Sequence, residues 1–181
     1  MSAWMRLGRL LDRFGDLLIA VSAVMLLLMV LLMGAEIGSR ALLKTSTQVA
    51  DEYAGYLFTW MTMCCFLYAQ RSDRFLRVDS LRHRLSPRVR AGMDAAAAVL
   101  GAMLSAVLLY ATWETFRGSV TFETLSIQPS QTPLYLPQAI MPAGFALLLL
   151  AFFHSGVTSL LQALGRIPVA ESNAPQPTSY E

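Results

Sequence analysis

Four long runs of apolar and small residues alternate along the chain with short polar stretches. A helix rises 1.5 Å per residue, so about 20 such residues cross the roughly 30 Å hydrocarbon core of a bilayer. Each run meets that length. The pattern therefore predicts an all-α membrane protein with four transmembrane helices, at about residues 17–37, 51–70, 94–113 and 137–161.

The segments outside these runs complete the predicted organisation. We expect the first run to be an uncleaved span, because its apolar core from Leu17 to Met33 is long for a signal peptide. Residues 1–165 then form one four-helix transmembrane domain. Residues 166–181 contain three prolines and few hydrophobic residues, so we predict a disordered cytoplasmic tail.

Basic residues collect on one side of the predicted membrane. Eleven of the 14 lie before the first span, between the second and third spans, or after the fourth. The opposite side holds only Arg40, Lys44 and Arg117. Because cytoplasmic loops carry an excess of Lys and Arg, both termini are predicted to be cytoplasmic.

The segment between the second and third spans, "RFLRVDSLRHRLSPRVRAGMD", has apolar residues at helical spacing. Val78, Leu81 and Leu85 are three and four residues apart, with arginines between them. This spacing predicts an amphipathic helix lying at the membrane interface, held to anionic headgroups. A plain topogenic loop explains the same charges equally well.

Composition supports the membrane assignment and narrows the function. Only 14% of the residues are charged, against about 25% in a soluble domain, and the mean hydropathy is +0.50. The chain has no nucleophile elbow, HExxH or glycine-rich phosphate loop, so we expect no enzymatic activity.

The chemistry-bearing residues inside the predicted spans are few. Cys64 and Cys65 are expected to be small apolar filler rather than a disulfide or metal site. His154 is expected to be a neutral, hydrogen-bonded packing residue. Because His83 lies in the basic loop, bis-histidine haem within this chain is excluded, and we expect no cofactor.

The first and third spans differ in the size of their side chains. The third carries two rows of small residues, which favour close packing against another helix. The rows are Ala97, Gly101 and Ser105, and Ala98, Ala102 and Ala106. The first span, "LLIAVSAVMLLLMVLLM", is bulky and suits lipid or a broad apolar partner surface.

Charged residues cluster where the first two spans face each other across a short loop. Glu36 and Arg40 are four apart, in the favourable order for a helical ion pair. Thr45 and Gln48 suggest a capping box that starts the second helix before Asp51. Glu52 would then lie nearly two turns into that helix, either solvating its end or contributing to a docking surface.

Three stretches of the chain resemble the small, four-helix Q-type subunit of tripartite ATP-independent periplasmic (TRAP) transporters. The stretches are "DEYAGYLFTW", "RSDRFLRVDSLRHRLSP" and "PLYLPQAIMPAG". In the first, Glu52 and Trp60 match the family's glutamate and tryptophan eight apart. In the second, Phe75 stands where the family carries a histidine. In the third, Pro137, Pro142 and Gly144 have the family's spacing.

The resemblance implies a non-catalytic support subunit in the bacterial inner membrane. Its partners would be a large, sodium-coupled, elevator-type permease subunit and a periplasmic binding protein that delivers an organic acid. Membrane lipids would surround it, and no nucleic acid is expected. On this basis we select interface candidates and candidates for anchoring at the inner membrane surface. The interface candidates are Glu52, Tyr56, Trp60 and Pro142. The anchoring candidates are Arg71, Arg77, Asp79 and Arg82.

Two other classes of protein remain open. A small multidrug transporter acting as a homodimer would need a membrane-embedded carboxylate, for which Glu36 is the candidate. A membrane anchor of a redox complex would reveal itself by haem absorbance in the purified complex. The identity of any transported substrate is not encoded in these residues.

Overall fold

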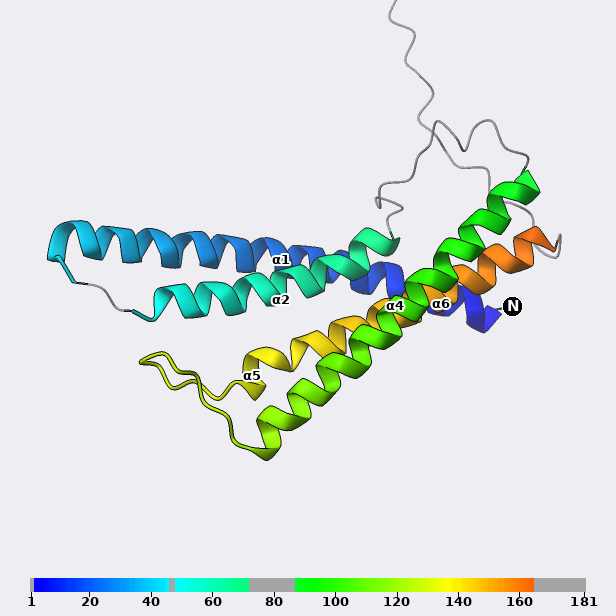
Figure 1. Cartoon of the computed structure of the whole chain (residues 1–181). Coiled ribbons are helices and arrows are strands. Elements are labelled where there is room, and N and C mark those ends of the chain that lie inside the picture. The colour runs from blue at the N-terminus through cyan, green and yellow to red at the C-terminus, as the bar shows by residue number, and fades with distance from the viewer. Residues whose placement is uncertain (1, 46–47, 72–86, 165–181) are drawn as a thin grey trace, which may run out of the picture.

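The computed structural model describes residues 2–45, 48–71 and 87–164 (Figure 1). These residues form five helices: α1 (Ser2–Leu43), α2 (Ala50–Arg71), α4 (Pro87–Thr121), α5 (Tyr135–Gln138) and α6 (Ile140–Ala163). Their only β pairing is an isolated bridge between Leu125 and Pro133 in the loop between α4 and α5. The all-α expectation is confirmed for the described part of the chain.

Within the described ranges, three helical stretches are long and apolar enough to cross a membrane: Arg6–Leu43, Gly92–Thr121 and Tyr135–Gln162. They correspond to the first, third and fourth predicted spans. The 22-residue helix α2 coincides with the second, but its tyrosines, threonines and tryptophan make it less apolar. Its role as a fourth span stays a prediction.

Two helices continue well beyond the runs that predicted them. Helix α1 has 42 residues and α4 has 35, which corresponds to lengths of about 63 and 52 Å. The sequence pattern located only the uncharged part of each helix. Charged residues indicate where the hydrocarbon layer ends, but a helix can continue past them. Both helices therefore continue past the uncharged runs through turns that contain charged residues.

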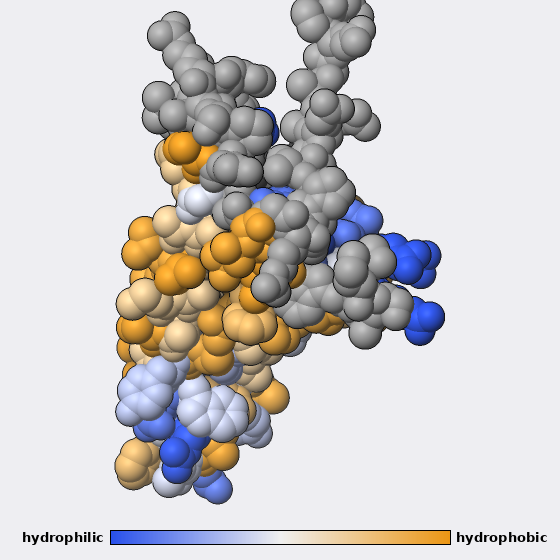
Figure 2. Space-filling model, turned by 90° about the vertical axis from the view of Figure 1, so that its right-hand side faces the viewer, coloured by the Kyte–Doolittle hydropathy of each residue, from blue (hydrophilic) through white to orange (hydrophobic). Residues whose placement is uncertain are grey.

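The long helices lie in the spatial order α1, α2, α6, α4. Helix α1 packs along α2, α2 contacts α6, and α6 packs along α4 (Figure 1). The two edge helices are the least enclosed: 6% of the most apolar stretch of α1 and 11% of that of α4 are buried, against 33% for α5 and α6. Figure 2 shows apolar side chains over most of the surface that includes α4, with hydrophilic ones at its lower end.

The close packing of α4 on α6 depends on small residues. Ala98 and Ser105 are buried, and a Cβ on Gly101 would lie 2.4 Å from the Phe152 ring. The predicted small-residue contact is therefore confirmed for these positions. Ala97 and Ala106, from the same two rows, are exposed because both rows wind around the helix away from α6.

The predicted capping box at the start of the second span is wrong. Helix α2 begins at Ala50, and the Tyr53 amide donates to the Val49 carbonyl at 3.1 Å. Gln48 has a φ of 56°, outside the helical range, so no helix extends back to Thr45. Glu52 consequently lies in the first turn of α2. A carboxylate there is stabilised by the positive end of the helix dipole.

Several predictions concern residues outside the described ranges. Residues 74–86 of the predicted amphipathic segment, which contain Arg77, Asp79 and Arg82, are among them. The tail at residues 166–181 is another. Both assignments stay predictions.

Candidate functional site

Glu52 joins α2 to the loop at residues 122–134. Its carboxylate accepts hydrogen bonds from the hydroxyls of Tyr56, one turn further along α2, and Ser130, in the loop. Ser130 also accepts from the Thr132 hydroxyl at 3.0 Å, and that hydroxyl lies 3.1 Å from the Tyr53 hydroxyl. We call these five residues the loop cluster. It fastens the loop to the first turns of α2.

Trp60 extends this attachment by one helical turn. Its indole Nε1–H donates to the Pro137 carbonyl at 3.2 Å, within α5. Pro137 is buried, and so is Pro142 in the first turn of α6. A proline supplies no backbone N–H, which suits the first turn of a helix. Trp60 thus binds the carbonyl at the point where α5 gives way to α6.

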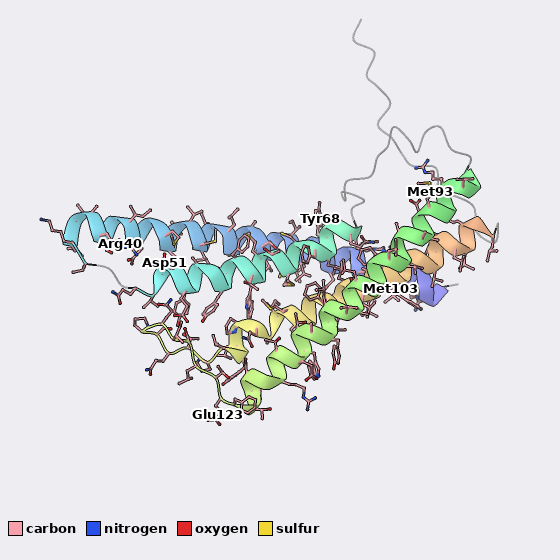
Figure 3. The ribbon with its side chains drawn as sticks, in the orientation of Figure 1. Arg40, Asp51, Tyr68, Met93, Met103 and Glu123 are labelled. Atoms are coloured by element: carbon pink, nitrogen blue, oxygen red, sulfur yellow. The ribbon has the colours of Figure 1, made fainter. Side chains whose placement is uncertain are left out.

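A second set of charged side chains holds α1 to α2 near the same end of the molecule. Arg40 Nε donates to Glu36 Oε1 at 2.8 Å, and its guanidinium lies 3.8 Å from Asp51 (Figure 3). The Glu36 side chain is 3% exposed, whereas that of Asp51 is 69% exposed. The predicted ion pair between Glu36 and Arg40 is confirmed, and Asp51 is a weaker, solvent-facing partner.

At the opposite end of α2, Arg71 connects three helices. Its Nε donates to Asp12 of α1 at 2.7 Å, and a second nitrogen donates to the Gly8 carbonyl at 3.3 Å. A third lies 3.2 Å from His154 Nδ1 on α6. We call these four residues the arginine cluster. With a side chain 15% exposed, Arg71 is largely enclosed by its partners.

The arginine cluster explains the histidine inside the fourth predicted span. His154 is buried, and an arginine can only donate, so Nδ1 must accept with its lone pair. That arrangement requires the neutral ring, as the sequence predicted. A Cβ on Gly8 would lie 3.1 Å from the same ring, so α1 approaches α6 closely here because position 8 has no side chain.

The interface candidates chosen from sequence thus bind other parts of their own chain. Glu52, Tyr56 and Trp60 hold the loop and α5 to α2, and Pro142 is buried. Sequence reasoning missed Ser130 as the partner of Glu52. The spacing of Glu52, Tyr56 and Trp60, four residues each, was the available signal, because it places all three on one helix face.

Sequence reasoning also missed the partners of Arg71, which was chosen as a membrane-surface anchor. Asp12 and His154 are 59 and 83 residues from it along the chain, so no local spacing connects them. Cys64 is buried and Cys65 partly so, and both are free thiols. Among the described residues no group of three possible metal ligands gathers.

Comparison with known proteins identifies one family. The model of the family described as "Tripartite ATP-independent periplasmic transporters, DctQ component" matches residues 29–162. The match covers α2, α4, α5, most of α6 and the second part of α1. No curated protein and no solved structure matches the chain.

Proposed function

The chain belongs to the DctQ component family of tripartite ATP-independent periplasmic (TRAP) transporters, and from this membership we propose that it scaffolds the large permease subunit. The permease would be of the sodium-coupled elevator type and would take up an organic acid delivered by a periplasmic binding protein. The chain itself would catalyse no reaction and would lie in the bacterial inner membrane with four spans.

The observation that carries this proposal is the exposure of the two edge helices. Helices α1 and α4 leave most of their apolar surface uncovered by the chain. Leu27 on α1 is 58% exposed, and Met103 on α4 is 62% exposed. Helices in lipid gain no hydrophobic driving force, so a partner must supply close packing. Two exposed apolar edges suit a subunit that enlarges a static scaffold.

The polar side chains of the spans support a structural role over transport by this chain alone. His154 is bound by Arg71, and Glu36, the candidate for a homodimeric exporter, is paired with Arg40. A transport site needs ionisable groups that exchange partners with a substrate or ion. These groups instead connect helices of the same chain, and family membership does not favour the exporter.

The interface role predicted for Glu52, Tyr56 and Trp60 is proposed in an indirect form. They would position the loop at residues 122–134 for the partners on the outer side. That loop exposes Phe122 by 81%, Leu125 by 50% and Ile127 fully. Apolar side chains held out from a fixed loop are suited to contact with a protein partner.

Anchoring at the inner surface by Arg71, Arg77, Asp79 and Arg82 also stays a proposal. Arg71 would act through α1 and α6, by fixing the direction in which the chain leaves α2. The other three lie outside the described residues. The substrate is open, and dicarboxylates, sialic acids and keto acids all fit an organic-acid carrier.

Site-directed photocrosslinking in native membranes tests the scaffold proposal. A photoreactive residue is placed at Leu27 on α1 or at Met103 on α4, with Ser105, which is buried against α6, as the control. We expect the permease to be captured from at least one edge and not from the buried control. Capture of lipid alone at both edges, or of a second copy of this chain, would contradict the proposal.

A further inference from the structure

The first turns of α1 carry an arginine stripe. Arg6, Arg9 and Arg13 are three and four residues apart, which places them on one helix face, and all three are exposed. Among the described residues, neither an ion pair nor a hydrogen bond involves their side chains. Arg40, Arg71 and Arg117, by contrast, each pair with a carboxylate.

An apolar stripe lies immediately beside the arginines. Its members are exposed by between 41% and 62%: Leu7, Leu10, Phe14 and Leu17. Each follows an arginine by one residue or continues that row by helical spacing, so the two stripes are neighbours on the helix surface. The apolar stripe leads directly into the uncharged part of α1.

The packing of α1 leaves both stripes exposed. It also leaves the arginine stripe with an excess of positive charge. Helix α1 turns its small face, Gly8 and Gly15, toward α6 and α2, while the members of both stripes stay exposed. Asp12, which follows Arg9 by three residues, is bound by Arg71 at 2.7 Å. Asp16 alone remains close to the stripe, and it does not balance three arginines.

The position of the arginines relative to the membrane indicates what they meet. Arg13 precedes Leu17 by four residues, which is about 6 Å along the helix. The headgroup layer on each side of the hydrocarbon is about 5–7 Å thick. Arg13 therefore lies at phosphate depth where the apolar run begins, and arginine recognises phosphate through paired N–H donors.

We propose that this face of α1 is a binding site for an anionic phospholipid of the leaflet in which α1 begins. Arg9 and Arg13 hold the phosphate, and Arg6 adds to the local positive potential. Leu10 and Phe14, exposed beside the arginines, contact the apolar part of the bound lipid nearest its headgroup. The end of the molecule at which α1 begins faces the viewer in Figure 2, with hydrophilic side chains projecting beside apolar ones.

Native mass spectrometry of the purified full chain, titrated with phosphatidylglycerol or phosphatidylcholine, tests this site. The variant R6Q/R9Q/R13Q removes the charge, R6K/R9K/R13K keeps it, and R117Q removes one positive charge at the far end of α4. Each arginine near a headgroup contributes roughly a five-fold gain in affinity for anionic lipid. We expect phosphatidylglycerol retention to fall roughly a hundred-fold in the glutamine variant and little in R117Q. The lysine variant should fall between them, because it keeps the charge and loses the paired N–H donors.

Each of three results would overturn the proposal. Equal retention of the two lipids by the wild-type chain would indicate ordinary annular lipid. Unchanged retention in R6Q/R9Q/R13Q would remove the arginines from the site. Loss of retention when the permease is bound would assign the face to that partner.

A second measurement keeps the test decisive where the glutamine variant is not recovered. Wild-type retention of phosphatidylglycerol is followed as salt is raised from low to high concentration. Screening weakens an exposed arginine–phosphate contact, so we expect retention to fall toward that of phosphatidylcholine. Phosphatidylglycerol retention that does not change as the salt concentration rises would overturn the proposal.

Discussion

Gly101 is the position where the packing of α4 on α6 is most easily tested. A Cβ there would lie 2.4 Å from the ring of Phe152, whereas ordinary van der Waals contact begins at about 3.4 Å. The substitution Gly101→Ala therefore forces the ring, or the two helices, to move by about 1 Å. Overpacking of this kind costs about 1–3 kcal/mol. Alanine also gains up to about 1 kcal/mol in helix propensity over glycine.

Gly118 on the same helix is the matched control, because nothing lies within 4 Å of a Cβ built there. Gly118→Ala receives the propensity gain without the clash, so the difference between the two variants isolates the contact. We expect Gly101→Ala to be less stable than Gly118→Ala by about 1–3 kcal/mol. At roughly 2–4 °C per kcal/mol, the melting temperatures in mild detergent differ by several degrees.

The partner side chain supplies the second half of this test. Phe152→Leu shortens the group that clashes, so the double variant with Gly101→Ala should regain part of the lost stability. Measured as a thermodynamic cycle, the two changes should couple by more than about 0.5 kcal/mol. Equal melting temperatures for Gly101→Ala and Gly118→Ala, or additive effects in the cycle, would refute this account of the interface.

Two further predictions concern the polar clusters. Arg71→Gln should lower the free energy of unfolding by about 1–3 kcal/mol, because a charged donor shared by three helices is lost, while Arg117→Gln should have little effect. Equal melting curves for these two variants would contradict the bridging role. Glu52→Gln should increase protease cleavage in the loop at residues 122–134 several-fold, whereas Asp51→Asn, at an exposed side chain, should not. Unchanged cleavage after Glu52→Gln would show that the loop is held by other contacts.

The part of the fold that the sequence predicted depends on the membrane as the solvent and on the spacing of residues within one helix. Apolar runs located three of the helices, because a bilayer demands about 20 such residues irrespective of what they pack against. The ion pair between Glu36 and Arg40 was predictable for a similar reason, since helical spacing alone brings the two together. Small residues on α4 likewise predicted a close contact with another helix, although they did not identify that helix as α6.

What sequence missed depends on contacts between distant segments. The start of α2 was misplaced because Thr45 and Gln48 have the right residue types for a cap, whereas the positive φ of Gln48 excludes that residue from the helix. The arginine cluster and the attachment of Glu52 to Ser130 join residues more than 50 positions apart. No periodicity within one helix reports such a pairing, so only the folded arrangement reveals it.

The proposed function requires the chain to be a subunit of a larger permease complex. Affinity purification of the tagged chain from its native membrane, followed by native mass spectrometry of the intact complex, measures this. We predict one copy of the chain bound to one large polytopic permease. A stable homodimer with no permease would contradict the claim, and it would return attention to the carboxylate of Glu36.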